Sequence, residues 1–197
     1  MVRSLNYRII LASNSPRRKE LLSGIDVDFE VRVIDGIDES YPDMLDARDI
    51  PEFISRKKAA AYRETIADDE LVITADTVVI LGRQVMGKPK DVEEACQMLR
   101  QLSGKTHQVI TGVTLTTLVR QVSFSVETDV TFKQFSEEEI DYYVSRYKPF
   151  DKAGAYGIQE WIGHIGVTWM SGSYFNVMGL PVQRIYEKLK DFEVVMR

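Results

Sequence analysis

The feature that most constrains the fold is a long apolar run, residues 71–81, that contains a single carboxylate, Asp76. β-Branched residues dominate the run and Gly82 follows it, a pattern that predicts a buried strand. Because a carboxylate in such a strand is costly to desolvate, it needs a paired charge, a metal ion or an open strand end. Buried ionisable groups of this kind favour a functional site, so Asp76 is the first candidate catalytic residue. The structural alternative is an inward carboxylate that a lysine or backbone amides satisfy.

Helical and strand patterns alternate along the whole chain, which predicts an α/β protein. The expected strands cover residues 7–12, 29–34, 71–81, 107–118 and 122–132. The expected helices cover residues 16–22, 50–67, 91–102, 140–147 and 182–192. No repeat, linker or low-complexity segment marks a boundary, so we expect one domain over residues 1–197, with room for two lobes.

The charge balance excludes several classes of partner. The chain of 197 residues has 25 Lys and Arg against 30 Asp and Glu, a net charge of -5. A general nucleic-acid or membrane surface needs a basic excess, so we expect neither partner. The single Cys96 excludes an intramolecular disulfide and a Cys-rich metal cluster. The apolar run at residues 9–12 is too short for a signal peptide, so the expected compartment is the cytoplasm.

A candidate anion site lies at the first strand-to-helix turn, residues 11–18. Ser15 before Pro16 predicts a capped helix start, whose unpaired backbone N–H groups can bind an anion. Ser13 and Ser15 add hydroxyl donors, and Arg17 and Arg18 add guanidinium groups suited to phosphate. The alternative is a capped helix whose arginines are solvated.

Two lysines are further candidates for contacts with phosphate. Lys88 follows a G-x-x-x-x-G-K pattern, but Pro89 stands where a Walker phosphate loop needs Ser or Thr, so we reject that motif. Lys88 remains a candidate charge in a cleft, with an ordinary surface lysine as the alternative. Lys58 lies in the helix expected at residues 50–67, where a solvated helix face is the alternative.

Two other segments supply weaker candidates. Glu39 could be a second oxygen ligand for a divalent cation, and the alternative is a solvated acidic loop. Residues 151–159 are rich in small side chains, which let the backbone approach a ligand closely. Gln159 could bind the edge of a base through its amide, and the alternative is a tight structural turn.

Taken together, these motifs resemble the Maf family of nucleoside triphosphate pyrophosphatases. The resemblance follows the chain in order through residues 11–18, 36–39, 58–59, 75–79, 87–89, 102–107, 111–113, 151–159, 172–174 and 177–181. Each motif is weak alone, but their joint order and spacing are specific. One departure is Lys57, where the family often has an acidic residue.

The resemblance implies a two-lobed α/β fold, with an elongated mixed sheet flanked by helices and a central cleft, similar to the inosine triphosphate pyrophosphatases. It also implies metal-dependent cleavage of nucleoside triphosphates to the monophosphate and pyrophosphate. Asp76 matches the catalytic proton acceptor of the family. Arg17, Thr77 and Gln159 match positions of substrate choice in the branch that acts on dTTP and UTP, whereas a sister branch prefers a modified guanine nucleotide.

The resulting hypothesis is a dTTP and UTP pyrophosphatase that requires Mg²⁺ or Mn²⁺. Asp76 and Glu39 are the expected metal ligands. The residues expected to bind the substrate are Ser13, Ser15, Arg17, Arg18, Lys58, Thr77, Lys88 and Gln159. The resemblance also allows a homodimer. The alternatives are a pyrophosphatase for modified purine nucleotides and a non-catalytic nucleotide-sensing regulator of cell division.

Overall fold

The computed structural model describes residues 7–192, which form two compact units. The described part of the first unit comprises residues 7–76, 111–126 and 179–192, and the second comprises residues 77–110 and 127–178. The division in one strand falls between Asp76 and Thr77. Among the described residues, no helix combines the length and apolar character needed to cross a membrane.

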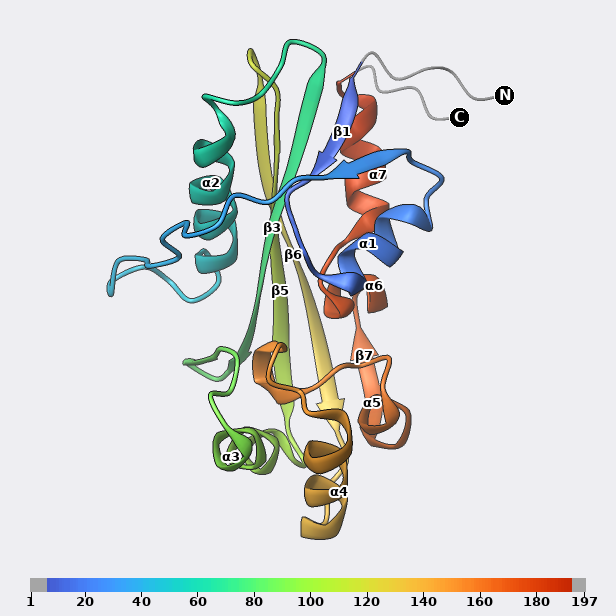
Figure 1. Cartoon of the computed structure of the whole chain (residues 1–197). Helices are drawn as coiled ribbons and strands as arrows, with labels where there is room; N and C mark the ends of the chain where they lie inside the picture. The colour runs from blue at the N-terminus through green and yellow to red at the C-terminus, as the bar shows by residue number, and fades with distance from the viewer. Residues whose placement is uncertain (1–6, 193–197) are drawn as a thin grey trace. The chain divides into compact units, whose positions relative to one another are not determined.

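The described residues contain a seven-stranded mixed sheet (Figure 1). Its strands are β1 (Arg8–Leu11), β2 (Phe29–Val31), β3 (Glu70–Leu81), β4 (Gln84–Met86), β5 (Thr106–Thr116), β6 (Gln121–Phe132) and β7 (Val167–Ser171). The strand order is β2-β1-β3-β5-β6-β7, and β4 also pairs with β3. β1 is parallel to β2 and β3, whereas the β3–β4 and β6–β7 pairs are antiparallel. The mixed sheet and its helices confirm the predicted α/β class.

Side-chain caps mark the start of some of the helices. The helices are α1 (Pro16–Ser23), α2 (Ile50–Tyr62), α3 (Val92–Leu102), α4 (Glu137–Tyr147), α5 (Trp161–Gly166), α6 (Tyr174–Met178) and α7 (Val182–Lys190), with a 3₁₀ turn at Ala153–Ala155. Ser15 caps α1, and Ser136 forms a capping box with Glu139 at the start of α4. The helices α5 and α6 were not predicted from the sequence.

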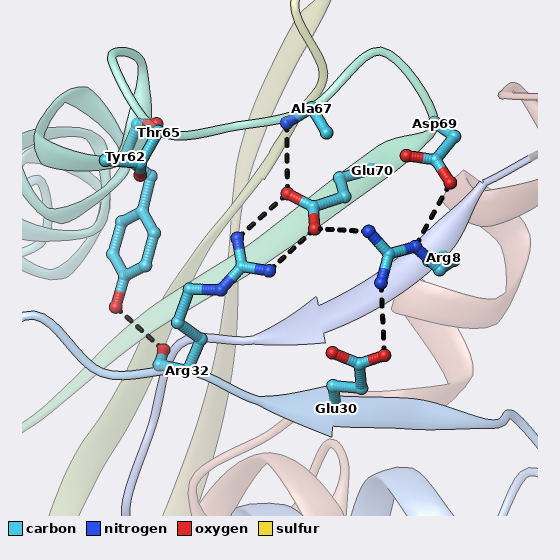
Figure 2. Close-up of polar contacts among 8 residues, drawn as sticks. All are labelled: Arg8, Glu30, Arg32, Tyr62, Thr65, Ala67, Asp69 and Glu70. Atoms are coloured by element: carbon cyan, nitrogen blue, oxygen red, sulfur yellow. Dashed lines mark hydrogen bonds and ion pairs between the residues drawn. The ribbon is translucent and has the colours of Figure 1, made fainter.

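A buried carboxylate, Glu70, joins the three parallel strands of the first unit (Figure 2). Its side chain accepts hydrogen bonds from Arg8 at 2.9 Å and from Arg32 at 2.6 and 2.8 Å. Arg8 also binds Asp69 at 3.1 Å and Glu30 at 3.2 Å. These five residues, the Glu70 cluster, connect the first residue of β1 with β2 and with the first residues of β3.

Tyr62 explains why two predicted elements end early, through its hydroxyl for β2 and through its backbone carbonyl for α2. The hydroxyl donates to Arg32 O at 2.9 Å (Figure 2). It also accepts from Ile34 N at 3.0 Å, so the chain leaves the sheet after Val31. The strand predicted at residues 29–34 therefore covers only Phe29–Val31. The backbone N–H groups of Thr65 and Ile66 both donate to Tyr62 O, which ends α2 five residues before the predicted residue 67.

Candidate active site

Asp76 forms an ion pair with Lys58 inside the first unit. Lys58 Nζ lies 2.9 Å from Asp76 Oδ1, and the two side chains are only 14% and 15% exposed. The carboxylate in the apolar strand is therefore paired with a lysine, as the structural alternative predicted. The same ion pair also fixes the direction of the Asp76 carboxylate, which a catalytic carboxylate requires.

Lys58 brings a second carboxylate to the same point. Its Nζ lies 3.0 Å from Glu39 Oε1, and the Glu39 side chain remains 55% exposed. Glu39 lies in the irregular segment between β2 and α2, far from Asp76 in the sequence. One ammonium group thus holds two carboxylates that the sequence predicted as metal ligands, and one of the two is accessible to solvent.

Buried polar contacts fix the helix that carries Lys58. Thr74 Oγ1 of β3 donates to Ser55 O of α2 at 2.7 Å, and the Ser55 hydroxyl lies 2.8 Å from Thr114 Oγ1 of β5. A Cβ atom at Gly112 would lie 2.2 Å from the Pro51 carbonyl carbon, so the first turn of α2 rests directly on β5. Ser55 lies about one turn and Pro51 about two turns before Lys58, so these contacts fix the helix that carries Lys58 toward Asp76.

The turn before α1 has the geometry that the sequence predicted. The hydroxyl of Ser15 accepts from Arg18 N at 3.4 Å, and the buried Ser13 hydroxyl accepts from Ser15 N at 3.2 Å. Both hydroxyl groups therefore order the backbone at the start of the helix. The first backbone N–H groups of a helix have no acceptor within the helix, so they can donate hydrogen bonds to an anion.

Arg18 is anchored beside Asp76 and is not a solvated arginine. Its Nε donates to Gly179 O at 2.8 Å, and its Nη1 donates to Ala75 O at 2.9 Å. Burial lowers the pKa of Arg18, and the negative charge of Asp76 opposes this change. The positive charge of Arg17 lowers the pKa of Arg18 further, and the negative charge of Glu39 raises it. The structure therefore brings the α1 turn, Arg17, Arg18 and the two carboxylates into one region of the first unit.

The other three predicted residues belong to the second unit. Thr77 is half-buried in β3, and Lys88 is exposed in the segment after β4. Strand β4 lies where a Walker phosphate loop would be, which agrees with our rejection of that motif. Gln159 lies in the loop before α5, where its Oε1 is buried and has no hydrogen-bond partner among the described residues.

A network that the sequence did not reveal supports the loop of Gln159. The buried Lys152 binds Asp151 at 2.7 Å and Glu160 at 3.1 Å. The Tyr143 hydroxyl of α4 donates to Glu160 and accepts from Gly157 N at 3.0 Å. The loop is therefore ordered by side-chain contacts to residues on both sides of Gln159.

His107 and Cys96 are buried side chains with structural surroundings. His107 Nε2 lies 2.7 Å from the Tyr156 hydroxyl, and burial lowers the pKa of His107 to about 4. Burial also raises the pKa of Cys96, so its thiol stays protonated and inert at neutral pH.

Comparisons with known proteins agree with the motifs. The family model described as "Maf-like protein" matches residues 8–192. A protein of Phocaeicola vulgatus named "dTTP/UTP pyrophosphatase" is 66% identical over 184 residues, 93% of this chain and 95% of that protein. A protein of Parabacteroides distasonis with the same name is 61% identical over 186 residues, 94% of this chain and 96% of that protein.

Among solved structures, that of a HAM1 protein from Coxiella burnetii covers 94% of this chain and 99% of its own, with 14% identity and a TM-score of 0.46. The family model and the curated relatives both extend over nearly all of the sequence. The resemblance drawn from the motifs is confirmed, and the chain belongs to the Maf family.

Proposed function

We propose that this chain hydrolyses dTTP and UTP to the nucleoside monophosphate and pyrophosphate. The observation that carries the proposal is the meeting of Asp76, Glu39 and Lys58 beside the anchored Arg18. Relatives 66% and 61% identical to the chain are named dTTP/UTP pyrophosphatase, which supports this choice of substrates. A non-catalytic sensor would need the cations but neither carboxylate.

The reaction requires positive charge around the phosphates. A water molecule attacks the α-phosphorus and pyrophosphate leaves, so negative charge develops on both sides of the bond. In our proposal, Arg17, Arg18 and Lys58 bind the phosphate oxygens, together with the Ser13 and Ser15 turn. Lys88 of the second unit is proposed as a further phosphate contact. Asp76 orients the attacking water and accepts its proton.

The carboxylates fit a divalent cation. Among the described residues no group of three or more His, Cys, Asp or Glu side chains could hold a metal ion. Mg²⁺ commonly takes only one or two protein carboxylates and completes its shell with phosphate oxygens and water. Glu39 and Asp76 would hold Mg²⁺ or Mn²⁺ in this way. When bound, the ion neutralises phosphate charge and makes the attacking water more acidic.

The amide of Gln159 favours a pyrimidine base with an imide group. Its buried Oε1 has no hydrogen-bond partner among the described residues, so it is available as an acceptor. Uracil and thymine present an imide N–H donor, whereas cytosine presents an acceptor at the same ring position. This difference supports dTTP and UTP over CTP.

The single-domain organisation, the homodimer and the cytoplasmic location stay predictions.

A panel of triphosphates tests the proposal. With Mg²⁺, we expect UTP and dTTP to give UMP or dTMP with pyrophosphate, and CTP, ATP and GTP to react much more slowly. Removing the metal with EDTA should lower the rate by at least about 100-fold, because charge neutralisation is lost. Products are separated by anion-exchange chromatography.

Each alternative gives a different result in the same panel. Preference for a modified purine triphosphate would favour the sister activity, and no product from any triphosphate would favour the sensor. Release of orthophosphate would mean that a different bond is cleaved.

A further inference from the structure

The residues on both sides of Glu39 form a compact turn, Asp38–Ser40. Asp38 Oδ1 accepts from Ser40 N at 2.9 Å, and Asp38 Oδ2 accepts from the Ser40 hydroxyl at 2.7 Å. The segment that contains this turn, residues 32–49, has no helix or strand. Contacts made by side chains must therefore determine where the backbone of Glu39 lies.

Lys57 of α2 attaches this turn to the helix. Its Nζ lies 2.8 Å from Asp38 Oδ2, 2.8 Å from Ser40 O and 3.4 Å from Ser40 Oγ. The contacts involve the residue before Glu39 and the residue after it. The ammonium group has three N–H donors, and three oxygen atoms of the turn surround it.

Two consecutive lysines of α2 thus bind two consecutive acids of the turn. Lys57 binds Asp38 at 2.8 Å, and Lys58 binds Glu39 at 3.0 Å. The two contacts differ in kind, because Lys58 also binds Asp76, whereas Lys57 binds only atoms of the turn in the hydrogen bonds and ion pairs described here.

We propose that Lys57 is a positioning residue, which holds the Asp38–Ser40 turn against α2 so that the Glu39 carboxylate meets Asp76 as a ligand for a divalent cation. The role of Glu39 rests on the proposed function. Without Lys57 the turn would sample more conformations, and ordering it again would reduce the affinity for the cation. The bound cation would restore the geometry once its concentration is saturating.

The variant Lys57→Met tests the proposal, because it keeps most of the side-chain length and removes the charge. The matched control is Arg56→Met on the same helix, where Arg56 pairs with Glu52 one turn away, at 2.5 Å. The first measurement is amide hydrogen exchange of residues 36–42. We expect exchange to be about threefold to fivefold faster in Lys57→Met and unchanged in Arg56→Met, in line with a partly exposed ion pair.

The second measurement is the dissociation constant of Mn²⁺, from the electron paramagnetic resonance signal of the free ion, with a non-hydrolysable α,β-methylene analogue of UTP present. We expect binding about threefold to fivefold weaker in Lys57→Met, with kcat at saturating Mn²⁺ within about twofold of wild type. Asp38→Asn should weaken binding similarly, and the double variant should be no worse than either single variant.

Three results would overturn the proposal. Unchanged exchange in Lys57→Met would mean that Lys57 does not order the turn. Faster exchange with unchanged Mn²⁺ affinity would mean that the order of the turn does not position Glu39. Additive losses in the double variant would mean that Lys57 and Asp38 act separately. If the wild type neither binds Mn²⁺ nor cleaves UTP, the proposed function fails, and the exchange data still report on the turn.

Discussion

Replacing Asp76 by asparagine is expected to abolish cleavage of UTP while the protein remains folded. In the proposed mechanism the change removes both the proton acceptor and a ligand for the cation, so we expect kcat to fall by at least about 1000-fold. Asparagine has nearly the same size as aspartate, and Lys58 keeps its ion pair with Glu39. The free energy of unfolding should therefore change by no more than about 1 kcal/mol.

The measurements are kcat at saturating Mg²⁺ and urea unfolding of the same samples. Asp129→Asn is the matched control, because it makes the same change in a half-buried strand carboxylate of β6. We expect the control to keep its activity within about twofold of wild type, because Asp129 is not among the proposed catalytic or substrate-binding residues. Activity retained in Asp76→Asn would remove Asp76 from the mechanism.

The second large effect concerns stability and the Glu70 cluster. Glu70→Gln should lower the free energy of unfolding by about 3 kcal/mol, because it removes the carboxylate from a buried ion pair. Arg32 loses the carboxylate that it binds, whereas Arg8 keeps its contacts with Asp69 and Glu30. The Glu70 side chain is 2% exposed and accepts from Arg8, Arg32 and Ala67 N. The control Glu30→Gln removes only the exposed contact to Arg8, so we expect a loss below about 1 kcal/mol. Equal losses in both variants would contradict the account of the cluster.

The same carboxylate predicts how stability depends on pH. Hydrogen bonding to Arg32 lowers the pKa of Glu70 from 4.5 to about 2 in the folded protein. Between these pH values the carboxyl group binds a proton more readily in the unfolded chain than in the folded protein. The contribution of Glu70 to the free energy of unfolding is therefore fully present above about pH 4.5 and declines toward pH 2. Urea unfolding at several pH values should show this decline, and the difference between wild type and Glu70→Gln should shrink over the same range. A constant difference would be inconsistent with the lowered pKa.

Local signals predicted the elements that carry the candidate site. The Ser15–Pro16 pair acts on the helix that follows it, and the apolar run at residues 71–81 has the composition of a buried strand in any context. Both elements appear in the structure, and together they bring Arg18 to the backbone of Ala75 beside Asp76. The sequence does not identify the residue that pairs with Asp76, because that residue depends on how α2 packs against β3 and β5.

Contacts between segments that are distant in the chain could not be predicted from the sequence. Glu70 is buried because the parallel register places Arg8 opposite it, and no pattern of neighbouring residues encodes that register. The end of β2 depends on the Tyr62 hydroxyl, which competes with the sheet for backbone groups. The end of α2 depends on the Tyr62 backbone carbonyl, which accepts from Thr65 and Ile66. The helices α5 and α6 have six and five residues, too few to give a helical period.

The sequence contains one signal for the ion pairs between the Asp38–Ser40 turn and α2. Asp38 and Glu39 are adjacent acids, and Lys57 and Lys58 are adjacent lysines. Matching the two pairs would have predicted both ion pairs of the turn with α2.

The most direct test of the central claim follows the oxygen atom of the attacking water. UTP is hydrolysed with Mg²⁺ in water enriched in ¹⁸O, and the products are analysed by ³¹P nuclear magnetic resonance and mass spectrometry. Attack at the α-phosphorus, oriented by Asp76, predicts that the label enters UMP and that pyrophosphate stays unlabelled. Label in pyrophosphate, or release of labelled orthophosphate, would contradict the account.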